Sequence, residues 1–136
     1  MTRLVIDPDV ALRLTQDGAP ALPPRHRLLA PTLLRSQLLS RLYQAVRAGQ
    51  MERRQADARL DRVRALRLRL LGDRVLQRVA WQLAEQLGWD DTATAEYVAL
   101  TRLQADAFVT QDVQLRRALK GVVPVATLKD LLAANE

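Results

Sequence analysis

The stretch GWDDTATAEYVALTRLQADAFVTQD, residues 88–112, joins a helical pattern, a short apolar run and five carboxylates. The helix is expected to open at Asp91 or Thr92, since both residue types are favoured at helix starts, and to run to about Gln104. The apolar run at 107–110 predicts a short buried strand, and Asp112 lies two residues beyond it. The stretch therefore presents acids near the start of a helix and beyond the end of a strand.

Helices and short apolar strands alternate along the rest of the chain as well. Further strands are expected at 3–7, 27–31, 66–71 and 122–126, and further helices at 8–17, 32–48, 51–66, 74–87, 113–121 and 127–134. Short buried strands separated by helices predict a parallel sheet that is covered on both faces. With 136 residues, the chain is expected to form one α/β domain over 1–136.

The composition excludes several classes of protein. The chain has no cysteine, which excludes a disulfide framework, a thiolate nucleophile and a zinc–thiolate site. The absence of cysteine also favours a cytoplasmic setting. No apolar run approaches the roughly 18 residues of a membrane span, and the first residues form no secretory signal. The net charge of +6 suits a polyanionic partner such as nucleic acid.

Two acids end strands that lie far apart in the sequence, Asp7 after the first strand and Asp112 after the strand at 107–110. Ligands of open parallel sheets bind beyond the carboxyl ends of the strands, so these carboxylates meet if the two strands are neighbours where the strand order reverses. Clustered carboxylates without His or Cys favour Mg²⁺ or Mn²⁺, which promote attack on a phosphodiester. The alternative is that Asp7 and Asp112 only cap the helices that follow them.

Four segments together resemble the PIN domain, and within it the VapC toxins of type II toxin–antitoxin systems. They are LVIDPDVALRL (4–14), LLAPTLLRSQLLSRLYQAVRAG (28–49), AEYVALTRLQADAFVTQDVQL (95–115) and VVPVATLKDLL (122–132). They cover nearly the whole chain in the family's order, and EYVALTRLQADAFVT is the most specific match. The resemblance implies a PIN-like three-layer sandwich, with a central parallel sheet of four to five short strands flanked by helices.

The chemistry implied by the resemblance is Mg²⁺- or Mn²⁺-dependent cleavage of RNA by four acids, and two of these acids are replaced here. Asp7 and Asp112 match the family, but Gln37, six residues past Pro31, and Thr94, three residues before Tyr97, stand where acids are expected. Gln37 still offers an oxygen to a cation or a water, and Thr94 is a neutral outer donor. The loss of two formal charges predicts weak metal binding.

Asp91 is the acid best placed to compensate. It lies about 60° from Thr94 around the expected helix, one turn earlier, so it is a candidate third metal ligand beside Asp7 and Asp112. The alternative is that Asp91 caps the helix.

Two functional hypotheses follow from the resemblance. The first is a VapC-like endoribonuclease toxin with weakened metal binding, paired with a VapB-like antitoxin. The second is a catalytically degenerate PIN domain that binds RNA or a protein partner without cleavage. The family also implies a homodimer, with its seam on the helical arm that follows the strand at 27–31 and on the helix from Thr32. A receiver-like signalling domain is disfavoured, because Asp73 is poorly placed as a phosphate acceptor.

The other conspicuous side chains are expected to be mainly structural. Trp81 and Trp89 lie on or beside an apolar helix face and are expected in the core, while Tyr97 is expected to pack beneath the site. A group of arginines is expected to form either a solvated helix face or an RNA-facing patch. Its members are Arg53, Arg54, Arg59, Arg62, Arg64, Arg67 and Arg69.

Overall fold

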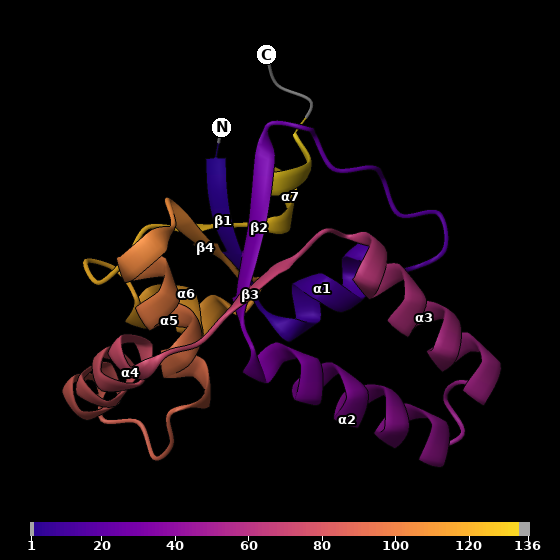
Figure 1. The fold of residues 1–136 in the computed structure, drawn as a ribbon, viewed down its shortest axis with the longest axis horizontal. Coiled ribbons are helices and arrows are strands. Elements are labelled where there is room, and N and C mark those ends of the chain that lie inside the picture. Colours follow the sequence, from indigo (N-terminus) through magenta and orange to yellow (C-terminus); the bar gives the residue numbers. More distant parts are fainter. Residues whose placement is uncertain (1, 134–136) are drawn as a thin grey trace.

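Five parallel strands form the centre of the molecule in the computed structural model, which describes residues 2–133 (Figure 1). Their order across the sheet is β3-β2-β1-β4-β5. The strands are β1 Thr2–Ile6, β2 His26–Pro31, β3 Arg69–Leu71, β4 Ala107–Val109 and β5 Val125–Ala126. The predicted α/β class and parallel sheet are therefore confirmed.

Helices flank the sheet on both sides. They are α1 Pro8–Leu14, α2 Leu33–Arg47, α3 Arg53–Ala65, α4 Arg74–Leu87, α5 Ala93–Gln104, α6 Val113–Ala118 and α7 Leu128–Leu132. In Figure 1, α1, α2 and α3 gather to the right of the strands, and α4 and α5 lie to the left. Within residues 2–133, no helix is long and apolar enough to cross a bilayer.

The first strand lies in the middle of the sheet, and the strand order reverses beside it. The chain continues from β1 to β2 and β3 on one side, then returns to place β4 and β5 on the other. Val5 pairs with Phe108 and Ile6 with Val109, so β1 and β4 end together. β1 and β4 are therefore neighbours at the reversal, which is the condition for Asp7 and Asp112 to lie at one edge of the sheet.

Aliphatic side chains make most of the core. Val5, Ile6 and Val109 from the two central strands are fully buried, as are Val98 of α5 and the single phenylalanine, Phe108. Burial of such a side chain contributes roughly 1.5–3 kcal/mol, so the apolar residues that precede the site hold its two strand ends firmly.

Two expected strands are shorter than predicted. The strand expected at 66–71 begins only at Arg69, because Leu66 closes α3 and Arg67 adopts a left-handed φ of 55°. The strand expected at 122–126 shrinks to β5, since the N–H groups of residues 122 and 123 bond to the Leu119 carbonyl in a turn after α6. The expected closing helix at 127–134 is observed as α7, and residue 134 lies outside the described residues.

Candidate functional site

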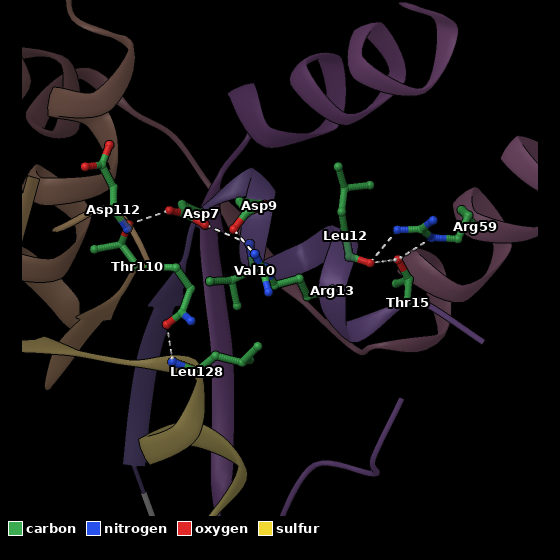
Figure 2. A network of polar contacts seen from close by, with 11 residues as sticks. Asp7, Asp9, Val10, Leu12, Arg13, Thr15, Arg59, Thr110, Asp112 and Leu128 are labelled. Atoms are coloured by element: carbon green, nitrogen blue, oxygen red, sulfur yellow. Dashed lines mark hydrogen bonds and ion pairs between the residues drawn. The ribbon is translucent and has the colours of Figure 1, made fainter. Parts of the chain in front are cut away.

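Asp7 is the central acid of the candidate site. It follows the last residue of β1 and caps α1, where its Oδ1 accepts a hydrogen bond of 2.8 Å from the Val10 N–H. Its Oδ2 accepts a second bond of 2.7 Å from the hydroxyl of Thr110, just beyond β4 (Figure 2). Burial raises the pKa of the Asp7 carboxyl, and these two hydrogen bonds oppose that rise. Asp7 therefore caps α1, and the same half-buried carboxylate lies beside Thr110 at the ends of β1 and β4.

Thr110 joins Asp7 to the segment that presents Asp112. The Thr110 side chain is completely buried, and its Oγ1 also accepts a bond of 3.3 Å from the Asp112 N–H. Asp112 is exposed and caps α6, with its Oδ1 accepting from the Leu115 N–H at 3.0 Å. Figure 2 shows the two acids on either side of Thr110, with the Asp112 carboxylate extending away from Asp7. The two predicted acids thus share one edge of the sheet.

Gln37 enters the site through a hydrogen bond to Tyr97. The Tyr97 hydroxyl donates to Gln37 Oε1 at 2.5 Å, and the tyrosine side chain is only 2% exposed. Burial raises the pKa of the Tyr97 phenol, and the negative charge of Asp7 adds to the rise. The bond occupies one acceptor site of the Gln37 side-chain oxygen, and the amide N–H groups remain as donors for a ligand. Tyr97 packs beneath the site as expected, and also against Phe108, with ring centroids 6.1 Å apart.

Thr94 lies in an acidic cleft on the other side of Asp112. The cleft has a volume of about 340 Å³ and is lined by Trp89, Asp90, Asp91, Thr94, Asp112 and Leu115. Asp91 Oδ1 accepts a hydrogen bond of 3.0 Å from the Ala93 N–H, so its carboxylate serves the start of α5. An acid at position 94 would therefore lie close to Asp112, whereas Asp91 is turned toward a backbone group.

The predicted ligands Asp7, Asp91 and Asp112 do not form one compact group. Within residues 2–133, no three Asp, Glu or His side chains lie close enough to hold a metal ion between them. Asp7 lies beside Thr110 and near Tyr97, which is the hydrogen-bond partner of Gln37. Asp112 and Asp91 instead line the acidic cleft together with Thr94. The donors present at the Asp7 edge fit one Mg²⁺ or Mn²⁺ ion only if further oxygens come from water or substrate.

Two arginines of the expected patch serve the structure instead. Arg59 donates to the Leu12 carbonyl at 2.5 Å and to Thr15 Oγ1 at 3.2 Å (Figure 2), and Arg62 donates to the Thr15 carbonyl at 2.8 Å. These carbonyls lie at the end of α1, where helical partners are missing and positive charge is favoured. Arg59 and Arg62 thus attach α3 to α1 by hydrogen bonds. Their spacing in the sequence did not indicate this role.

The prediction for Trp81 was wrong, because this residue is 64% exposed on α4. Trp89 is half-buried and packs against the core, and it also lines the acidic cleft. The helix α4 packs against α5 through Leu76, Ala80, Leu83 and Ala84, and this narrow buried stripe leaves Trp81 on the outer face.

Comparisons with known proteins support the fold. No family model matches the sequence, and no significant match was found among curated proteins. Among solved structures, PAE2754 from Pyrobaculum aerophilum matches with a TM-score of 0.78 and 21% identity, covering 96% of this chain and 93% of that one. VapBC-1 from nontypeable Haemophilus influenzae matches with a TM-score of 0.65 and 13% identity, covering 93% and 98%.

A third structural match is VapBC2 from Rickettsia felis, solved bound to a DNA fragment from the promoter. It has a TM-score of 0.62 and 11% identity, covering 92% of this chain and 98% of that one. The chain therefore has a PIN-like α/β fold that it shares with these solved structures, two of which are of VapBC. At these identities the matches concern the fold, and the chemistry rests on the residues of this chain.

Proposed function

We propose that this protein is a VapC-like endoribonuclease of low activity, in which Asp7 and Asp112 hold one Mg²⁺ or Mn²⁺ ion together with a phosphate of the RNA. The observation that carries the proposal is the Thr110 hydroxyl, which binds Asp7 and accepts from the backbone of Asp112. Magnesium is commonly held by one or two carboxylates plus substrate phosphates, with several waters retained. Two acids therefore suffice for one ion once the substrate is bound.

The side chains of this chain have separate roles in the proposal. A divalent cation, when bound, would stabilise charge on the phosphodiester and lower the pKa of a coordinated water. Asp7 supplies negative charge from a half-buried position, and Asp112 supplies it from the exposed side of Thr110. Gln37 directs N–H donors toward a phosphate or water oxygen, and Thr94 offers a neutral hydroxyl in the cleft beside Asp112.

Asp91 contributes charge to the acidic cleft in this proposal. Its carboxylate accepts from the Ala93 N–H at the start of α5, and an asparagine at this position keeps an oxygen for that N–H. Asp91→Asn is therefore expected to weaken Mg²⁺ binding far less than Asp7→Asn does. If the two substitutions weaken it equally, Asp91 is a direct ligand.

The alternative is a degenerate PIN domain that binds RNA or a protein without cleavage. It is favoured by a specific observation, since both oxygens of Asp7 already accept hydrogen bonds from Val10 and Thr110. A carboxylate engaged in this way has fewer lone pairs for a cation.

One assay separates the two functions. The purified chain is incubated with single-stranded RNA and Mg²⁺ or Mn²⁺, beside Asp7→Ala and a control, Asp61→Asn, whose carboxylate is exposed and pairs with Arg64 on α3. The proposal predicts slow cation-dependent cleavage that Asp7→Ala abolishes and Asp61→Asn retains. Cleavage that persists in Asp7→Ala contradicts it, and no cleavage by the parent under any of these conditions establishes the degenerate alternative.

Two apolar surfaces support the proposal that the protein binds an antitoxin and a second copy of itself. An apolar cleft of about 440 Å³ lies between α2, α3 and the segment around β3, and it suits the apolar face of a VapB-like antitoxin helix. Its lining includes Leu34, Leu38, Leu60, Val63, Leu68 and Leu70. On α2, Leu39 and Tyr43 are 57% and 62% exposed one turn apart, which supports a homodimer seam there.

A further inference from the structure

Arg41 lies on the same face of α2 as Gln37, one turn further along. The Gln37–Tyr97 hydrogen bond fixes this face of α2 beside the buried tyrosine. Burial raises the pKa of the Asp7 carboxyl and of the Tyr97 phenol, and the positive charge of Arg41 partly offsets both rises, so the guanidinium lies within electrostatic reach of both groups. Arg41 is therefore the basic side chain at the Asp7 edge.

The Arg41 guanidinium is exposed, and no carboxylate among residues 2–133 forms an ion pair with it. Several other arginines differ in this respect, because Arg13, Arg53, Arg62 and Arg64 each pair with a nearby aspartate. An exposed guanidinium presents its donors in a planar fork that matches the oxygens of a phosphate.

We propose that Arg41 and the Gln37 amide form a phosphate-binding pair that holds the RNA backbone at the Asp7 edge. In the resembled family an acid at position 37 would help to recruit cations, which in turn attract phosphate. Here the two neighbouring side chains of α2 offer N–H donors instead, and positive charge comes from the protein itself. This inference rests on the proposal that the protein acts on RNA, and it specifies how the RNA strand is bound.

Replacing acids with neutral side chains at positions 37 and 94, beside Arg41, changes which ions the Asp7 edge attracts. Acids at positions 37 and 94 would add to the repulsion that Asp7 and Asp112 exert on phosphate in the absence of cations, whereas Arg41 opposes that repulsion without metal. Arginine clamps stabilise charge on a reacting phosphoryl group, as metal ions do. The pair is therefore expected to position a phosphate whether or not cleavage follows.

RNA binding without metal tests the pair. Binding of a fluorescent single-stranded RNA oligonucleotide is measured in EDTA at several salt concentrations for the parent chain, Arg41→Gln, Arg41→Lys and Arg47→Gln. Arg47 is the matched control, because it is an exposed arginine of α2 that lies six residues further along and about 120° around the helix from Arg41. Thermal unfolding of each variant establishes that the fold is retained.

Arg41→Gln is expected to weaken binding about tenfold, the usual scale for loss of a hydrogen bond to a charged group. It should also reduce the slope of log K against log salt by about 0.7, as expected for one phosphate contact on a single strand. Arg41→Lys should keep the slope and lose part of the affinity, since lysine lacks the planar fork. Arg47→Gln should bind within about twofold of the parent, because its face of α2 lies away from the Asp7 edge.

Equal losses in Arg41→Gln and Arg47→Gln would overturn the inference, since they would indicate diffuse attraction to a basic surface. Unchanged binding in Arg41→Gln would overturn it as well. The cleavage assay remains a separate readout. A parent chain that binds RNA through Arg41 but never cuts it supports the phosphate-binding pair and removes the proposed nuclease activity.

Discussion

The Thr110 hydroxyl donates a hydrogen bond of 2.7 Å to Oδ2 of Asp7, joining the ends of two neighbouring strands that are about 100 residues apart in the sequence. The same oxygen of Thr110 accepts from the Asp112 N–H. One buried hydroxyl therefore fixes the position of the central carboxylate relative to the second acid, and its removal has consequences for both charge and stability.

Thr110→Val is expected to lower the free energy of unfolding by about 1–3 kcal/mol, since it leaves Asp7 Oδ2 and the Asp112 N–H without their partner. It should also raise the pKa of Asp7 further, because the Thr110 bond opposes the rise caused by burial. Denaturant unfolding and carboxyl NMR titration measure the two effects.

The matched control is Thr101→Val. Thr101 is as buried as Thr110, but its hydroxyl donates to the Tyr97 carbonyl within α5. Its loss leaves the helical backbone bonded and Asp7 untouched, so the pKa of Asp7 should stay at the parental value. A shift of equal size in both variants would show that the Thr110 bond has no specific effect on Asp7.

The raised pKa of Asp7 predicts a pH-dependent stability. Between the unfolded pKa near the ordinary 3.8 and the higher folded pKa, the folded chain binds more protons than the unfolded chain. The contribution of Asp7 to stability is therefore fully present below the unfolded pKa and is lost as the pH rises through the folded pKa.

Asp7→Asn removes this dependence and keeps a good helix cap for α1. The free energy of unfolding of the parent should fall relative to that of Asp7→Asn as the pH rises from about 3.8. Urea unfolding across this range gives the comparison. Parallel curves for the two proteins would show that Asp7 titrates alike in the folded and unfolded states.

Arg59→Gln tests the attachment of α3 to α1. Loss of the bonds to the Leu12 carbonyl and Thr15 Oγ1 is expected to cost about 1–3 kcal/mol in denaturant unfolding, because the end of α1 loses partly buried partners. The control is Arg53→Gln, whose ion pair with Asp57 is exposed and should contribute below about 1 kcal/mol. Similar costs for both variants would contradict a special role of Arg59.

The sequence predicted the class of fold because it follows from local patterns. Short apolar strands, helix starts and the acids Asp7 and Asp112 are visible in the chain itself, and the parallel pairing of β1 with β4 brings the segments that carry these acids to one edge of the sheet. The contacts of Gln37 with Tyr97 and of Arg59 with α1 depend on how helices pack, which local spacing does not specify.

The exposure of Trp81 and the role of Thr110 were not predicted from the sequence, and both have a physical explanation. Trp81 is exposed because α5 covers only a narrow stripe of α4, and helical periodicity shows an apolar face without showing its width. Thr110 appeared in the sequence as the last residue of a strand, and its part in the site became apparent only from its hydroxyl bond to Asp7.

The most direct test of the account is the Mg²⁺ dependence of RNA cleavage by the parent and by the Gln37→Glu, Thr94→Asp double variant. At an assumed distance of about 6 Å, one added negative charge attracts a divalent cation by about 1.4 kcal/mol even at the dielectric constant of water, or about tenfold in affinity. If acid charge limits the site, the double variant should cut RNA at a Mg²⁺ concentration about a hundredfold lower than the parent requires. The same Mg²⁺ dependence in both proteins, or cleavage in neither, would contradict the claim that Asp7 and Asp112 form a weakened metal-dependent nuclease site.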